Sequence, residues 1–154
     1  VLSKEQIVQL LSIEPGSRAW EALGLAGRRA AKELTGERAY LWGAIGVDFV
    51  PCSMNCDFCS LGEKWGIVGE RREYNAEETV RQVREYAENG VRWIVLRTTE
   101  FYSQAQLGEM IRYIREQVPG AYEIGLNIGE FGVETAYWLA ECGVDFIYHS
   151  LRSG

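Results

Sequence analysis

The chain of 154 residues lacks several features that particular protein classes require. It has one histidine and three prolines, and no run of apolar residues is long enough to span a bilayer. Its net charge of −6 argues against a nucleic-acid-binding surface, which needs clustered positive charge. The N-terminus shows no signal-peptide pattern, and we find no internal repeat or low-complexity segment. With 47% hydrophobic and 25% charged residues, we expect a globular protein whose partners include neither nucleic acid nor membrane.

Cysteine is also scarce, but three of the four cysteines lie within eight residues. Cys52, Cys56 and Cys59 form a C-x3-C-x2-C run. This crowding suits a metal site better than a disulfide framework, and reduced thiols indicate a cytoplasmic setting. Three thiolates on a four-iron, four-sulfur cluster leave one iron without a protein ligand, where a substrate or cofactor can bind. The run therefore predicts a reactive metal site.

A zinc site is the alternative interpretation of these cysteines. Cys142 or His149 would then supply the fourth ligand. Zinc sites usually pair a C-x2-C unit with a second pair farther along the chain, and this sequence has no second pair. Cys142 comes at an expected helix end, so we predict a small buried residue rather than a ligand. We expect His149, the single histidine, to be packed and hydrogen-bonded.

Hydrophobic periodicity and capping signals predict two helices followed by strands that alternate with helices. The expected helices cover residues 3–11, 17–36, 75–89, 103–118 and 133–142. The expected strands cover residues 40–49, 91–97, 122–128 and 145–148. The long segment 50–74, which contains the three cysteines, is expected to be a loop.

This alternation indicates parallel strands with right-handed crossovers, and therefore an α/β fold. Four such strands cannot close a barrel that needs eight. They would form a partial barrel with unpaired edges, so we expect a truncated chain or a partner chain that completes the barrel. The predicted domains are an N-terminal helical extension over residues 1–38 and the partial barrel over residues 39–154.

The segment 52–60 reads CSMNCDFCS and resembles the cluster motif of the radical S-adenosylmethionine (SAM) superfamily. The N-terminal helices and the strand spacing are most similar to its biotin synthase-like group, which includes biotin and lipoyl synthases, hydrogenase-maturation enzymes and methylornithine synthase. The resemblance covers nearly the whole chain and implies a TIM-type (βα) barrel with the cluster loop after its first strand. It implies a 4Fe–4S cluster on Cys52, Cys56 and Cys59, with SAM at the open iron.

The resemblance also implies roles beside the cluster. Phe58 would lie by the adenine of SAM, although simple packing in the loop would also explain an aromatic residue there. Glu100 would meet the amino group of SAM, because a carboxylate suits an ammonium, and its alternative is a solvated loop acid. The preceding Thr98-Thr99 departs from the glycines that the family often has at this place.

Two further strand ends carry candidate residues. The resemblance implies that Ser150 and Arg152 contact the ribose and carboxylate of SAM, since a guanidinium fork fits a carboxylate. We expect Asn127 and Glu130, at the end of the third strand, to face the substrate. Glu130 could equally be an acidic residue at a helix N-terminus.

The activity implied by the resemblance is reductive cleavage of SAM to a 5′-deoxyadenosyl radical, which abstracts hydrogen from an unactivated carbon. We place sulfur insertion in cofactor biosynthesis first, as in lipoyl and biotin synthases, on the group resemblance and the Cys59-Ser60 form. Radical rearrangement or fragmentation in cofactor assembly comes second. Biotin synthases hold a sulfur-donating cluster with cysteines on the second and third strands, and residues 94–97 and 123–126 contain none.

The expected partners follow from this activity. A one-electron donor such as ferredoxin or flavodoxin would reduce the cluster, and the substrate would be a small molecule or a lipoyl- or biotin-type group. A non-catalytic metal-binding module, which docks a partner through its open sheet edge, is the alternative from another functional class.

Overall fold

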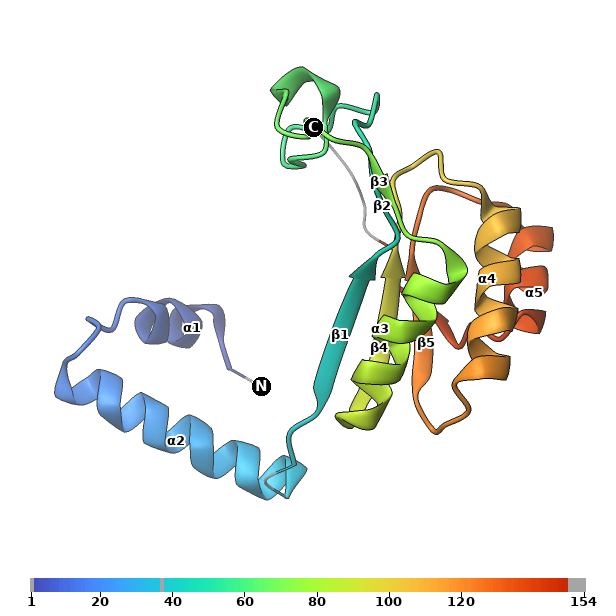
Figure 1. Cartoon of the computed structure of the whole chain (residues 1–154). Coiled ribbons are helices and arrows are strands. Elements are labelled where there is room, and N and C mark those ends of the chain that lie inside the picture. Colours follow the sequence, from blue (N-terminus) through green and yellow to red (C-terminus); the bar gives the residue numbers. More distant parts are fainter. Residues whose placement is uncertain (1, 37, 150–154) are drawn as a thin grey trace. The chain divides into compact units, whose positions relative to one another are not determined.

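The computed structural model describes residues 2–36 and 38–149. They fall into two compact units, residues 1–39 and residues 40–154. Both units are drawn in Figure 1, coloured along the sequence. None of the helices in the described ranges combines the length and apolar character needed to cross a membrane.

The first unit contains two helices whose ends are set by local capping. Helix α1 (Lys4–Leu11) begins with a capping box in which Ser3 and Gln6 bond each other's backbone N–H groups. Helix α2 (Arg18–Thr35) begins where the Ser17 hydroxyl accepts the Trp20 N–H at 3.2 Å, and it ends at the left-handed Gly36. Within this unit neither helix buries a side chain, and capping sets where each helix begins.

The second unit is built on one four-stranded sheet with the order β1-β4-β5-β6. Its strands are β1 (Leu41–Gly46), β4 (Val91–Arg97), β5 (Glu123–Asn127) and β6 (Phe146–Ile147). All three pairings are parallel, which confirms the expected α/β fold with four parallel strands.

Three helices connect these strands and cover one face of the sheet. They are α3 (Ala76–Glu88), α4 (Gln104–Gln117) and α5 (Val133–Glu141) (Figure 1). Val83, Ile111 and Leu139 from these helices share one buried core with every second residue of the strands, such as Ile94 and Ile124. Burial of these apolar side chains holds the helices on the sheet.

The other face of the sheet carries three rows of residues in register across the strands. From the carboxyl ends downward, the rows are Gly46, Arg97 and Asn127; Ala44, Val95, Gly125 and Phe146; and Trp42, Trp93 and Glu123. Inward-pointing residues stacked in layers are the interior arrangement of an α/β barrel. The ring of Trp42, on one edge strand, contacts that of Tyr148, which follows the other, at 5.8 Å between centroids. This contact spans the whole sheet and shows that the face is concave.

The expected single strand over residues 40–49 is wrong after Gly46, where β1 ends. The Val47 N–H still donates to the Arg97 carbonyl at 2.8 Å, but the Val47 carbonyl accepts from Tyr74 instead. The chain thereby leaves the main sheet, and β2 (Asp48–Phe49) pairs antiparallel with β3 (Arg72–Glu73). The Phe49 ring packs so closely on Gly46 that an added Cβ there would lie 2.6 Å from it.

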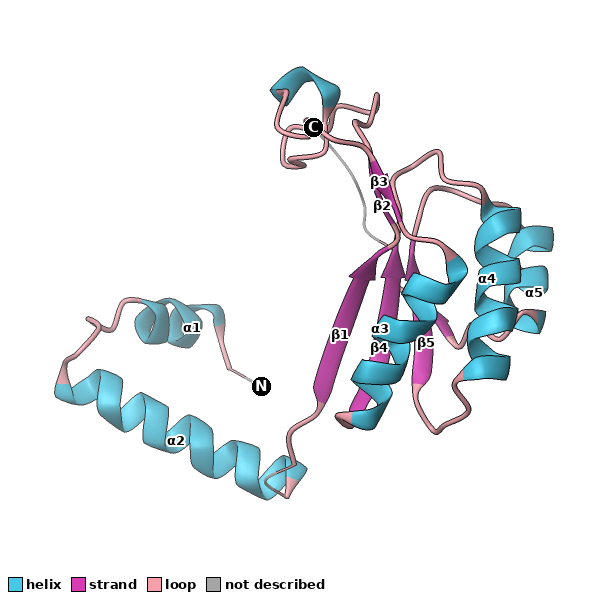
Figure 2. Cartoon of the chain, viewed as in Figure 1, coloured by secondary structure: helices cyan, strands magenta, loops and turns pink. Residues whose placement is uncertain are grey.

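The segment between β2 and β3 holds the cysteines and is not entirely loop. It includes a short 3₁₀ turn, η1 (Glu63–Trp65) (Figure 2). The two-residue β2–β3 ladder closes the base of this segment above the carboxyl ends of β1 and β4 (Figure 1). The cysteine segment is therefore placed at the end of the sheet where α/β barrels carry their active groups.

Candidate functional site

The cysteine segment closes on itself through backbone hydrogen bonds. The Cys52 N–H donates to the Leu61 carbonyl at 2.7 Å, and the Cys52 carbonyl accepts from Glu63 at 3.2 Å. Inside this closure, the Cys59 N–H donates to the Cys56 carbonyl at 3.1 Å. All three cysteines are therefore carried by one compact loop, residues 52–64, which we call the cysteine loop.

Asn55 stabilises the cysteine loop from inside. Its backbone has a φ of 50°, in the left-handed region that asparagine tolerates better than most residues. Its Oδ1 accepts the Lys64 N–H at 2.8 Å, and its Nδ2 donates to the Ser53 carbonyl at 3.1 Å. An added Cβ on Gly62 would lie 3.3 Å from the same Oδ1. Asparagine directly before Cys56, a predicted cluster ligand, is the sequence signal that could have identified this role.

The surface of the cysteine loop carries a second, exposed contact. The Lys64 ammonium forms an ion pair with Asp57 and lies 4.7 Å from the centre of the Trp65 ring. Hydrogen bonding to Lys64, and secondly its charge, lower the pKa of the Asp57 carboxyl. Because the pair is solvated, it adds little to stability.

The three cysteines open on a cavity of about 590 Å³ at the carboxyl ends of the strands. Its walls also include Phe58 from the cysteine loop, and Arg97, Thr99, Glu100 and Asn127 from the strand ends. The thiols of Cys52, Cys56 and Cys59 are free and partly buried. The structure thus brings most of the predicted site residues together around one space.

The donor set of this cavity fits an iron–sulfur cluster. A cluster spreads its ligands over several irons, and three thiolates are the soft ligands that iron–sulfur clusters take. The three partly buried thiols therefore fit a cluster with one open iron.

The two other candidate zinc ligands do not join the cysteine loop. Cys142 is buried, as expected, and its sulfur accepts a hydrogen bond from the Arg112 Nε at 3.2 Å. His149 was expected to be packed, but it is exposed. It follows the edge strand β6, where no further described strand covers it.

A buried carboxylate holds the backbone after β4. Asp48 is 4% exposed and accepts the Thr99 N–H at 2.7 Å and the Thr99 hydroxyl. Thr99 stands where the family often has glycine, so this pair fixes a segment that departs from the common form. Sequence reasoning missed Asp48, although an acidic residue inside the apolar run 45–50 was a signal for it.

Tyr102 lies beside this buried pair. Burial, followed by the charge and hydrogen bond of Glu73 and the charge of Asp48, raises the pKa of Tyr102 to about 12. The phenol therefore stays protonated, and remains a hydrogen-bond donor, to a more alkaline pH than an ordinary tyrosine.

Glu100 is positioned by the loop that follows β5. Its Oε1 accepts the Glu130 N–H at 3.1 Å. An added Cβ on Gly129 would lie 2.2 Å from the Glu100 carbonyl oxygen, so only glycine allows this approach. Glu130 contributes its backbone here, whereas its side chain is exposed and does not line the cavity.

The remaining candidates differ in their placement. Asn127 is buried, lines the cavity and donates from Nδ2 to the Tyr148 carbonyl at 2.6 Å. Phe58 lines the cavity with 66% of its surface exposed. Ser150 and Arg152 lie outside the described residues. Arg97 also lines the cavity, but the sequence analysis did not single it out. A strand residue reaches the cavity from only one face of the sheet, and the sequence alone does not show which face Arg97 occupies.

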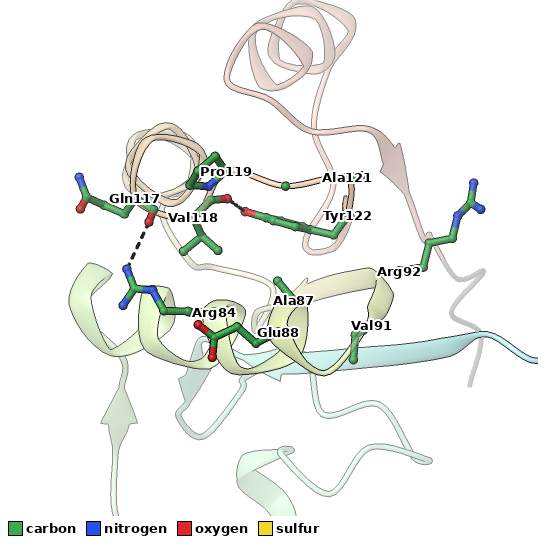
Figure 3. Close-up of a pocket in the computed structure, with 12 residues that line it drawn as sticks. Arg84, Ala87, Glu88, Val91, Arg92, Gln117, Val118, Pro119, Ala121 and Tyr122 are labelled. Carbon is green, nitrogen blue, oxygen red and sulfur yellow. Dashed lines mark hydrogen bonds between the residues drawn. The ribbon is translucent and has the colours of Figure 1, made fainter.

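A second cavity, of about 510 Å³, lies at the opposite ends of the strands. Figure 3 shows that it is bordered by the ends of α3 and α4. Arg84 donates to the Gln117 carbonyl at 3.2 Å, and the Tyr122 hydroxyl donates to the Val118 carbonyl at 2.6 Å (Figure 3). The first contact joins α3 to the end of α4, and the second joins the end of α4 to the residue before β5. Residues at this end of an α/β barrel serve stability.

Comparisons with known proteins agree with this geometry. The family model described as the radical SAM superfamily matches residues 49–154. No curated protein matches the chain.

Two solved structures share the fold. A methylornithine synthase (PylB) has a TM-score of 0.80 at 21% identity, and the match covers 96% of this chain and 43% of that chain. HydG, a maturase of the FeFe-hydrogenase, has a TM-score of 0.69 at 20% identity, over 93% of this chain and 32% of that chain. The chain thus spans less than half the length of either protein. The family match and the cysteine loop together show that the chain belongs to the radical SAM superfamily, whose members use a 4Fe–4S cluster and SAM.

Proposed function

We propose that the chain is the cluster-bearing part of a radical SAM enzyme that cleaves SAM reductively. The observation that carries this proposal is that the thiols of Cys52, Cys56 and Cys59 open on the same strand-end cavity as Glu100. The three cysteines would hold the cluster, and the cavity would hold SAM. When bound, the cluster supplies the electron that cleaves the sulfonium to methionine and a 5′-deoxyadenosyl radical.

The chain's own residues bind and orient SAM in this proposal. Glu100, fixed at its Oε1 by Glu130, accepts hydrogen bonds from the SAM ammonium. Phe58 covers the adenine, which explains why an apolar ring lies on the cavity rim. Ser150 and Arg152 are the proposed contacts to the ribose and carboxylate.

The rest of the enzyme supplies what this chain does not contain. Four strands are half of what a closed barrel needs, so a further part of the protein or a partner chain completes the barrel. A small one-electron donor such as ferredoxin or flavodoxin reduces the cluster. Thiol ligands that must stay reduced fit a cytoplasmic site of action.

Radical rearrangement or fragmentation of a small molecule is the reaction type that the structure favours. The concave face rows across β1, β4, β5 and β6 contain no cysteine. A sulfur-donating cluster of the biotin synthase kind therefore has no ligands on these strands. Methylornithine synthase and HydG share the fold, which is consistent with this choice. Sulfur insertion, which we place first on the sequence, would need an auxiliary cluster elsewhere in the protein.

Anaerobic reconstitution tests the proposal. The longest natural chain that contains these residues is loaded with iron and sulfide, reduced with dithionite and given SAM, and 5′-deoxyadenosine is measured. We expect a cluster and 5′-deoxyadenosine from the wild type and from Cys142→Ser, whose thiol lies apart from the cysteine loop. Cys56→Ser should lose both. A cluster or bound zinc with no SAM cleavage by that chain would instead support a non-catalytic metal-binding module.

A further inference from the structure

Arg97 occupies an unusual place for a charged side chain. It ends β4 in the uppermost row of the concave face, between Gly46 on β1 and Asn127 on β5. Its side chain is exposed and lines the cavity below the cysteine loop. Among the described residues that line this cavity, Arg97 carries the one positive charge.

The neighbouring polar groups have hydrogen-bond partners other than Arg97. Both carboxylate oxygens of Asp48 are engaged by Thr99. The Oε1 of Glu100 accepts from the Glu130 backbone, and the Asn127 amide donates to Tyr148. Over the described part of the chain, no hydrogen bond or ion pair engages the Arg97 guanidinium.

The lining of the cavity also has an apolar part, beside the polar Thr98, Glu100 and Asn127. Ala44 and Gly46 form its floor on β1, and the rings of Phe49 and Phe58 and the Met54 side chain border it. A guanidinium presents a planar fork of donors that matches a carboxylate. A ligand that satisfies this environment has a carboxylate at one end and an aliphatic part next to it.

We infer that Arg97 binds the carboxylate of the enzyme's substrate, which makes the substrate a small aliphatic carboxylic or amino acid. The inference rests on the proposed function, in which SAM and substrate meet in this cavity. The carboxylate of SAM is the other possible source of the same chemistry. In the proposed function that carboxylate is assigned to Arg152, whereas Arg97 belongs to the sheet floor and not to the cysteine loop. Arg97 therefore faces the second ligand.

Matched ligands and variants test this assignment by anaerobic titration calorimetry on the longest natural chain, loaded with cluster and SAM. The probes are hexanoate with hexanamide, and L-norleucine with L-norleucinamide. The variants are Arg97→Gln and Arg97→Lys. The control is Arg92→Gln, because Arg92 lies on the same strand but pairs with Glu123 away from this cavity.

We expect the wild type and Arg92→Gln to bind at least one acid roughly tenfold or more tightly than its amide. Arg97→Gln should abolish that preference, and Arg97→Lys, which keeps the charge without the fork, should retain part of it. SAM affinity, measured separately, should change by no more than about twofold in either variant, which also shows that the variants are folded.

Three results would overturn the inference. Equal wild-type binding of acids and amides, or no binding of either, would show that no carboxylate is recognised. A large loss of SAM affinity in Arg97→Gln with an unchanged acid preference would assign Arg97 to the carboxylate of SAM. An acid preference that survives in Arg97→Gln would place the carboxylate on another group. Since 5′-deoxyadenosine formation without substrate is measured separately, failure of the proposed function is distinguishable from each of these.

Discussion

Asn55 accepts the Lys64 backbone N–H on its Oδ1 at 2.8 Å and so joins the two ends of the segment that carries Cys56 and Cys59. Asn55 also has a positive φ. It therefore has two roles: its backbone forms a left-handed turn, and its side chain bonds across the loop. Because these two roles can be separated by substitution, they give the first prediction.

We predict that Asn55→Ala weakens cluster retention more than Asn55→Gly. Alanine loses the side-chain bonds and adds about 1–2 kcal/mol of left-handed strain, whereas glycine loses only the bonds, worth about 0.5–1.5 kcal/mol each. Asn55→Asp keeps the acceptor and should retain most of the cluster. Iron and sulfide per chain after gel filtration measure the effect. Ser53→Ala, on the same loop, is the control, and equal retention in all variants would show that Asn55 does not position the loop.

A second prediction concerns the buried Asp48. Asp48→Ala leaves the Thr99 N–H and hydroxyl without their partner, so we expect the free energy of unfolding to fall by about 1–3 kcal/mol. Asp57→Ala removes an exposed carboxylate and should change it by less than about 1 kcal/mol. Urea unfolding of the cluster-free proteins compares the two. Similar losses in both would mean that the Thr99 segment does not depend on Asp48.

The close approach of two loops gives a third prediction. Gly129→Ala places a Cβ against the Glu100 carbonyl, so the loop after β4 must shift and the Glu100 carboxylate moves with it. We expect a loss of about 1–3 kcal/mol in stability and a SAM affinity weakened by roughly tenfold. Gly69→Ala is a matched control, since nothing lies within 4 Å of its added Cβ. Unchanged SAM binding in Gly129→Ala would argue against Glu100 as a SAM contact.

The raised pKa of Tyr102 predicts a loss of stability at alkaline pH. In the unfolded chain the phenol ionises near its ordinary value of about 10, whereas in the folded chain it stays protonated up to about 12. The unfolded state therefore binds fewer protons in this window, and stability falls as the pH rises from about 10 to about 12. Urea midpoints across this range measure the fall, and Tyr102→Phe should reduce it. An identical pH dependence in the wild type and Tyr102→Phe would contradict the prediction.

The sequence predicts the regular part of the fold well, because local signals and core packing agree there. The helix expected over residues 103–118 is confirmed by α4, and Leu107, Ile111 and Ile114 on its inner face are buried. The strand over 40–49 fails at Val47, because the switch of its two backbone groups to different partner strands depends on the distant Tyr74.

The site shows the same division between local and distant information. The cysteine run could be predicted as a metal site because its spacing is a local feature of the sequence. Asp48 and Arg97 acquire their places only when β1, β2 and β4 are side by side. The acidic residue within the apolar run 45–50 marks Asp48 as unusual without showing its partner, and no local pattern marks Arg97. His149 was expected to be packed and is exposed, because whether a strand edge is covered depends on the rest of the sheet.

The cysteine loop is closed by hydrogen bonds between its own residues, from Cys52 to Lys64. It is joined to the barrel by the two residue pairs of the β2–β3 ladder. The conformation of such a loop is largely independent of the barrel that carries it. Hydrogen bonds within the loop set its conformation, and the barrel contributes only a short hairpin at a strand end. A peptide of this segment should therefore be able to assemble a cluster outside the barrel. The barrel would then be needed to form the floor of the cavity, which selects the substrate.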